Sequence, residues 1–192
     1  SWFQLGVGLA QVHLIKSDFF GFDYDNYIGR NLQVNTQVIF QNRKSWGEFF
    51  FKNRIGFQLD LMLRKRQPEK YSALNLMIRK LEEKIIEKIS SDDEPSLIHG
   101  DLWSGNVIFD LEENPVLIDP AVYFGNREAE FGMITLFGGF SPSFFKGYFQ
   151  EYPLKEGWEK RVQIYQLYHL LNHLNLFGDS YYNSITKLVN NL

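Results

Sequence analysis

The sequence has 192 residues, with 20 Lys and Arg against 23 Asp and Glu, and it contains no Cys. This length suits one domain with a single core, and a net charge of −3 without a long basic run argues against a nucleic-acid or polybasic membrane partner. The lack of Cys rules out a disulfide framework or a thiolate metal site and fits a reducing cytosol. No apolar run approaches the roughly 18 residues that span a bilayer, so we expect a cytoplasmic domain that acts on a small molecule.

Patterns in the amino-terminal part predict one helix and one loop. Apolar residues at positions 2, 5, 9, 12 and 15 predict a helix over residues 2–16, with no capping residue before it and with His13 in the core. Residues 18–36 contain two glycines, several Asn and Asp and no sustained period, which predicts a long surface loop. Such a loop is either a wall of the acceptor site or a solvated connector.

Capping signals divide the next stretch into two helices. Ser45-Trp46-Gly47-Glu48 is a capping box that starts a helix at Trp46, and apolar positions extend this helix to about Arg66. Pro68 opens the next helix, whose apolar stripe continues to residue 89 and whose charged residues form a solvated face.

Two short β-branched and aromatic runs, Val107–Phe109 and Val116–Ile118, flank a polar turn and predict a β-hairpin. Asp101 and Asn106 stand before the first strand, five residues apart, and Asp119 ends the second. Because a hairpin folds the chain between Asn106 and Asp119 back on itself, these three polar side chains can converge. The alternative is that they are three unrelated turn and strand-end residues.

Convergent oxygen-bearing side chains suit the transfer of a phosphoryl group from ATP. This reaction needs Mg²⁺ on the phosphates and an acceptor hydroxyl aimed in line. Mg²⁺ prefers oxygen ligands and usually keeps only one or two protein groups, which Asn106 and Asp119 can supply. Asp101 can then take the proton of the acceptor hydroxyl, and its spacing to Asn106 equals that in the protein-kinase catalytic loop.

Helix signals continue after the hairpin. We expect four further helices, over residues 128–137, 142–152, 156–177 and 180–191. Ser141 caps the second of them, and Gly178 ends the third. His169 and His173 stand one helical turn apart without a third ligand nearby, so they are better explained as core or helix-surface histidines than as a Zn²⁺ site.

Strings throughout the chain resemble the fructosamine/ketosamine kinase family. They are HGDLWSGN at 99–106, IDPAVYFGNRE at 118–128, FGGF at 137–140, YQLYHLLNHLNLFG at 165–178, Gly21-Phe22 and Gln33-Val34-Asn35. The resemblance implies a fold like that of aminoglycoside and choline kinases. It also implies phosphorylation of a sugar hydroxyl, the third one in fructosamines, on a small-molecule glycated amine or a glycated lysine.

The resemblance also indicates which residues surround the reacting groups. Trp103 is our candidate for sugar recognition, because an indole can stack on a sugar and donate a hydrogen bond; a packed structural Trp is the alternative. His99, Arg127, Glu128 and Glu130 are expected to support the site. For Arg127 and Glu128 we favour bracing over substrate contact, and Glu130 falls where some relatives place an Asp that supports the His-Gly-Asp turn.

Departures from the protein-kinase pattern favour a small acceptor. Pro120 and Ala121 replace the Phe and Gly that follow the metal-binding Asp, and Trp103 replaces a Lys common in protein kinases. Only about nine residues separate Asp119 from the next helical stretch at Glu128, and no Ala-Pro-Glu occurs, so a long activation loop with a peptide-docking platform has no room.

The nucleotide clamp of a kinase is missing from the sequence. Gly6-Val7-Gly8 is the only G-x-G, it lacks the later glycine, and no Val-Ala-Ile-Lys equivalent exists. We therefore expect a mainly α fold with a small β-hairpin (α+β), with residues 1–192 forming the carboxy-terminal lobe of a protein-kinase-like fold whose amino-terminal lobe is absent. Such a fragment alone should be inactive. The alternatives are a kinase for another small alcohol or aminoglycoside, or a non-catalytic binding domain.

Overall fold

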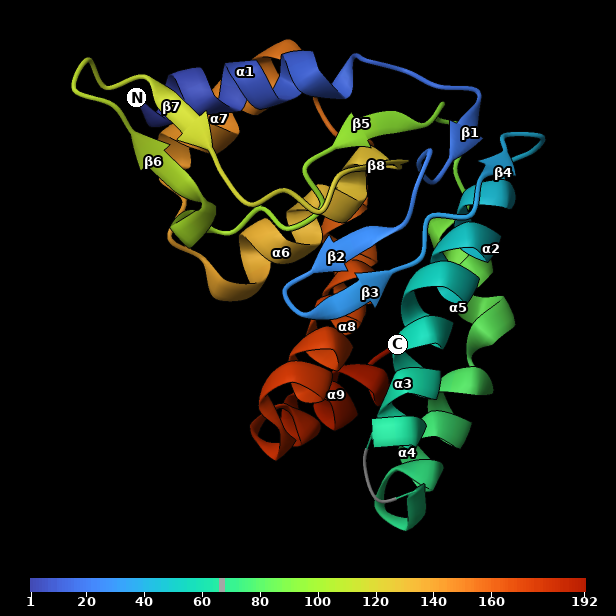
Figure 1. Ribbon diagram of the computed structural model, residues 1–192. Coiled ribbons are helices and arrows are strands. Elements are labelled where there is room, and N and C mark those ends of the chain that lie inside the picture. Colours follow the sequence, from blue (N-terminus) through green and yellow to red (C-terminus); the bar gives the residue numbers. More distant parts are fainter. Residues whose placement is uncertain (66–67) are drawn as a thin grey trace.

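The computed structural model describes residues 1–65 and 68–192 and is mainly helical with small antiparallel sheets (Figure 1). The helices of the described residues are α1 (Trp2–His13), α2 (Ser45–Phe50), α3 (Phe57–Lys65), α4 (Pro68–Arg79), α5 (Glu82–Ile89), α6 (Glu130–Phe137), α7 (Pro142–Glu151), α8 (Trp158–Phe177) and α9 (Tyr182–Val189). A π-helical segment, Phe51–Gly56, joins α2 to α3, and 3₁₀ turns occupy Ser104–Asn106, Arg127–Ala129 and Asp179–Tyr181. The predicted α+β class is confirmed.

The strands are short and pair antiparallel, two by two. The pairs are β1 (Phe19–Phe20) with β4 (Val38–Ile39), β2 (Asn26–Ile28) with β3 (Asn31–Gln33), β5 (Ser96–Ile98) with β8 (Tyr123–Gly125), and β6 (Val107–Phe109) with β7 (Pro115–Leu117). The pair β6–β7 is the predicted hairpin. Its turn is held by Asp110, whose Oδ1 accepts from the backbone N–H groups of Glu112 and Asn114 at 2.9 and 2.8 Å.

The first helix differs from its prediction at both ends. Ser1 caps α1, because its Oγ accepts from the backbone N–H of Gln4 at 3.5 Å, so the expectation of an uncapped start was wrong. The helix ends at His13 because the chain then extends, and Lys16 pairs with Ser96 of β5 in a β-bridge. His13 is fully buried, as predicted.

Residues 18–36 are not a simple surface loop. They contribute β1, β2 and β3, and the side chains of Asn31, Gln33 and Asn35 are buried. Amides of this kind form no hydrophobic period, which is why the pattern resembled a loop. They are stable inside the protein because they bond to each other and to backbone groups, as when Gln33 Nε2 donates to the Ala121 carbonyl at 2.9 Å.

The two predicted central helices are subdivided. Ser45 is the first helical residue and not the cap, and its Oγ accepts from the N–H groups of Gln41 and Asn42 at 3.2 Å. The predicted end at Arg66 lies outside the described residues. The start at Pro68 is confirmed, but the expected single helix to residue 89 breaks between α4 and α5.

Two hydrophobic clusters form the core. The larger one surrounds α8 and includes Trp46 and Tyr165, whose hydroxyl accepts from the Trp46 indole N–H at 3.1 Å. The smaller one lies among α1, α6 and α7, with Phe131 and Phe144 at its centre. In the ribbon, α1 and α7 run side by side next to the β6–β7 hairpin (Figure 1). No helix among residues 1–65 and 68–192 has the length and apolarity to cross a bilayer.

Candidate active site

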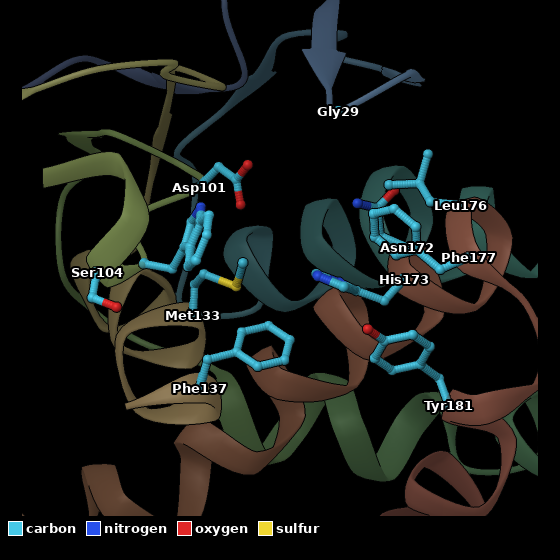
Figure 2. A pocket seen from close by; sticks show the side chains of 11 residues that line it. Gly29, Asp101, Ser104, Met133, Phe137, Asn172, His173, Leu176, Phe177 and Tyr181 are labelled. Atoms are coloured by element: carbon cyan, nitrogen blue, oxygen red, sulfur yellow. The ribbon is translucent and has the colours of Figure 1, made fainter. Parts of the chain in front are cut away.

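A sharp turn after β5 presents Asp101. Gly100 has a φ of +84°, and a Cβ built on it would lie 2.1 Å from the carbonyl oxygen of Ala121. Both the left-handed backbone and the close approach require glycine. The turn therefore brings the β5 end against the chain that follows Asp119, and Asp101 is directed away from that contact toward a cavity (Figure 2).

The carboxylate of Glu130 binds the backbone of this turn. It accepts from the backbone N–H of His99 at 2.6 Å and from that of Gly100 at 3.0 Å. Burial by itself would raise the pKa of Glu130, but the His13 imidazole 3.6 Å away and His99, whose backbone N–H donates to the carboxylate, hold the pKa below its usual range. An ionised Glu130 thus fixes the backbone just before Asp101.

Asn106 and His99 tie the turn to the end of β7. Asn106 Nδ2 donates to the Asp101 carbonyl at 2.8 Å, and the Asn106 carbonyl accepts from the Ile118 N–H at 3.1 Å. His99 Nε2 donates to the Ile118 carbonyl at 2.9 Å, so its Nδ1 is the atom that accepts from the Asp101 N–H at 3.3 Å. These bonds place Asn106 next to the residue that precedes Asp119.

The environment of Asp101 raises its pKa to about 7. Burial is the largest cause, and the negative charges of Glu130 and Asp119 add to it. A carboxylate with such a pKa is a stronger base than an ordinary aspartate and is still largely ionised just above neutral pH.

Asn106 and Asp119 are the residues that the sequence predicts as cation ligands. Asn106 uses its Nδ2 in the bond to Asp101, which leaves Oδ1 without a protein donor among the described residues. Within residues 1–65 and 68–192, no three His, Cys, Asp or Glu side chains are grouped to hold a metal ion. One carboxylate and one amide oxygen are nevertheless a sufficient protein contribution for Mg²⁺.

A cavity of about 420 Å³ opens in front of Asp101 (Figure 2). Trp103 stands beside it with 41% of its surface exposed, and the indole lies so close over Gly105 that a Cβ there would be 2.2 Å from the ring. The opposite wall comes from α8 and the turn after it. The cavity is lined by Gly29, Asp101, Trp103, Ser104, Met133, Phe137, Asn172, His173, Leu176, Phe177 and Tyr181.

Comparison with known proteins identifies the family. All of residues 1–192 match the fructosamine kinase family. The chain belongs to the fructosamine kinase family. It is 43% identical to a probable ketoamine kinase of Enterococcus faecium, covering 98% of this chain and 66% of the relative. It is 40% identical to a chloroplastic protein-ribulosamine 3-kinase of Arabidopsis thaliana, covering 97% of this chain and 55% of the relative.

A solved structure gives the same result for the fold. The crystal structure of a presumed fructosamine-3-kinase from Thermobifida fusca superposes with a TM-score of 0.85 at 31% identity, covering 98% of this chain and 63% of that one. The fructosamine kinase fold thus extends over nearly all of the chain. The chain spans a little over half to two thirds of the length of these three relatives.

In this family member, Arg127 and Glu128 contact other helices rather than the Asp101 turn. Arg127 Nη1 donates to the Tyr148 hydroxyl at 3.1 Å and to the Tyr152 carbonyl at 2.8 Å, which joins the 3₁₀ turn to α7. Glu128 accepts two bonds from Arg161 of α8, at 2.6 and 2.8 Å. Both pairs anchor the start of α6, and therefore Glu130.

The cavity wall from α8 is the part of the site that sequence reasoning missed. Asn172 and His173 line the cavity, whereas the sequence interpretation treated His173 only as a core or helix-surface histidine. His169 is buried, as expected. The one available signal was the string around these residues, which was used to recognise the family but not to place side chains.

Proposed function

We propose that the chain is the catalytic and acceptor half of an ATP-dependent kinase that phosphorylates a sugar hydroxyl, the third one in fructosamines, of a ketoamine. The observation that carries this proposal is Asp101, a carboxylate with a pKa of about 7 on the wall of a cavity large enough for a sugar. The names of the relatives, ketoamine kinase and ribulosamine 3-kinase, support the same class of acceptor.

In the proposed reaction, Asp101 accepts the proton of the acceptor hydroxyl as that oxygen attacks the terminal phosphorus of ATP. The Gly100 N–H donates to the Glu130 carboxylate, and Asn106 Nδ2 donates to the Asp101 carbonyl; these two bonds keep the Asp101 backbone, and with it the carboxylate, in place. Asn106 Oδ1 and the Asp119 carboxylate would hold Mg²⁺. When bound, Mg²⁺ neutralises charge on the phosphates.

We propose that Trp103 orients the acceptor. Its exposed indole lies on the cavity wall two residues from Asp101 and is held over Gly105. Stacking of the ring on the apolar face of the sugar would fix the plane of the sugar relative to the base.

We further propose that the nucleotide is clamped by a second lobe outside residues 1–192. The relatives extend beyond the matched region by a third or more of their length, and these 192 residues contain no glycine-rich phosphate loop followed by a strand Lys. Mg·ATP hydrolysis by residues 1–192 alone at kinase-like rates would contradict this assignment.

The central test is Asp101→Asn in the full-length protein. With Mg·ATP and a fructosamine, we expect the rate to fall by about 10²–10⁴-fold, because removal of a general base typically has this effect. Glu83→Gln, on the solvated face of α5, is the control and should retain wild-type turnover. A rate within a few-fold of wild type for Asp101→Asn would refute the role of this residue.

An acceptor panel tests the substrate class. We expect fructosamines and ribulosamines to be phosphorylated in preference to aminoglycosides and choline. Preference for one of the latter would replace the ketoamine assignment, and no transfer to any of them would favour a binding domain.

A further inference from the structure

A chain of hydrogen-bonded amides leads from the protein surface to the cavity wall. Lys65, at the end of α3, donates from Nζ to Asn31 Oδ1 at 2.9 Å. Asn31 Nδ2 donates to Asn172 Oδ1 at 2.8 Å, and Gln58 Nε2 donates to the same oxygen at 3.2 Å. Asn31, Gln58 and Asn172 are all buried.

The charge of Lys65 fixes the direction of this chain. An ammonium group can only donate, so the atom of Asn31 that faces it must be the oxygen. The Asn31 amide group therefore points its nitrogen at Asn172, and the atom of Asn172 that receives it must again be the oxygen. The amide orientations of Asn31 and Asn172 thus follow from which groups can donate and which can accept.

A second contact, from Gln58, gives the same orientation of the Asn172 amide. Asn175 Nδ2 donates to Gln58 Oε1 at 2.8 Å, which turns the Gln58 nitrogen toward Asn172. Asn172 Oδ1 thus accepts two bonds, and rotation of the amide would place its NH₂ group against two donors. The unfavourable contact in that alternative locks the side chain.

The Asn172 nitrogen is consequently left facing the cavity. Asn172 is 2% exposed and lines the cavity across from Asp101 (Figure 2). Its Nδ2 donates to no group among the described residues, although this amide is nearly buried. This nitrogen is not one of the fully buried polar atoms that lack a partner, so it is accessible from the cavity, and a ligand oxygen there would accept its hydrogen bond.

We propose that Asn172 is a specificity-determining residue of the acceptor site, whose Nδ2–H group donates a hydrogen bond to one oxygen of the sugar. This inference rests on the proposed kinase function. Two donated bonds on Oδ1 polarise the amide and strengthen its N–H as a donor. The amide stands opposite the base, so it would hold the sugar at a second point and distinguish acceptors by an oxygen that does not react.

The test compares wild type and Asn172→Ala in the full-length protein, using a fructosamine and a series of analogues that each lack one hydroxyl. We expect Asn172→Ala to raise KM by about 10–100-fold with kcat changed by no more than a few-fold, because the bond is present before and during the reaction. One of the analogues lacks the hydroxyl that Asn172 contacts. For wild type, loss of this hydroxyl should reduce kcat/KM about tenfold or more, whereas for Asn172→Ala it should reduce kcat/KM less than twofold.

A second variant guards against a folding defect. Asn172→Asp retains an oxygen for the donors of Asn31 and Gln58, so it should stay folded at the assay temperature even though a buried carboxylate lowers its thermal unfolding midpoint. It lacks the cavity-facing donor and should lose selectivity for the same hydroxyl. Asn183→Asp, exposed on α9, adds the same charge and should leave KM unchanged.

The outcomes separate the two proposals. If wild type phosphorylates the fructosamine and the KM of Asn172→Ala is within twofold of the wild-type KM, the role of Asn172 alone is overturned. The same holds if each missing hydroxyl lowers kcat/KM equally in wild type and in the variants. Failure of wild type to phosphorylate any ketoamine would overturn the proposed function and this inference with it.

Discussion

Asp101 combines a functional advantage with a structural cost. Its carboxyl group is largely buried, and two other carboxylates, of Glu130 and Asp119, act on it. These surroundings raise its pKa to about 7 and make it a better base. They also make the ionised form unfavourable in the folded protein, so stability and activity are opposed at this residue.

This opposition predicts a pH-dependent gain in stability for Asp101→Asn. The pKa is raised in the folded state, so the folded protein binds more protons than the unfolded chain between about pH 4 and 7. The free energy of unfolding of wild type therefore falls as the pH rises through this window. We expect the variant to be more stable by about 1–3 kcal/mol at pH 8 and by much less at pH 5.

Urea unfolding at the two pH values measures this difference. Asp92→Asn, at an exposed carboxyl, should change the free energy of unfolding by less than about 0.5 kcal/mol at either pH. An equal gain for Asp101→Asn at both pH values would show that charge at Asp101 is not the cause.

At the scale of elements, the position of α1 depends on two glycines. A Cβ on Gly6 would lie 2.1 Å from the Phe144 carbonyl oxygen, and one on Gly147 would lie 2.3 Å from the Phe3 carbonyl oxygen. The backbones of α1 and α7 are therefore in direct contact. This contact brings His13, at the end of α1, to the Tyr148 hydroxyl at 2.7 Å and close to Glu130.

The close packing of α1 and α7 predicts opposite effects of the same substitution on one helix. Gly6→Ala should lower the free energy of unfolding by about 1–3 kcal/mol, because a methyl group has no space between the helices. Gly8→Ala, where no atom lies within 4 Å of the added Cβ, should raise it by up to about 1 kcal/mol through helix propensity. Thermal unfolding of both variants tests the contact, and stabilisation by Gly6→Ala would disprove it.

At the scale of the whole molecule, the larger core contains neutral polar groups as well as hydrophobic ones. Tyr168 donates to Gln33 at 2.9 Å, and Asn175 donates to Gln58 on the neighbouring α3. His169 is buried among them, and burial lowers its pKa to about 3. Positive charges at His173 and Arg54 oppose its protonation further.

His169 should therefore contribute to acid sensitivity of the entire fold. Its pKa is lower in the folded protein than in the unfolded chain, so the unfolded chain binds more protons between about pH 6.5 and 3. Stability due to this residue is present above this window and is lost as the pH falls. We expect His169→Leu to reduce the difference in unfolding free energy between pH 7 and pH 5 by about 2 kcal/mol.

Urea unfolding of wild type and His169→Leu at both pH values gives this difference directly. Loss of packing alone would lower both values equally. Parallel pH dependences of the two proteins would therefore contradict the prediction.

Local patterns were enough to predict the parts of this protein that depend on neighbours in sequence. The β6–β7 hairpin, the helix starts at Pro68 and Pro142, and the helix end at Gly178 follow from turn and capping chemistry within a few residues. The spacing of Asp101, Asn106 and Asp119 predicted that a hairpin brings them together; Asn106 bonds to the Asp101 carbonyl, and the shared site of the three residues stays a prediction. Family membership also followed from contiguous strings.

Tertiary structure alone decided what depends on distant segments. The buried amides of Asn31 and Gln33 look like loop residues in sequence, and only partners far along the chain make their burial favourable. The cavity wall at Asn172 likewise depends on helix packing. Hydrophobic periodicity shows which face of an element is buried, but it does not show which polar groups will meet there.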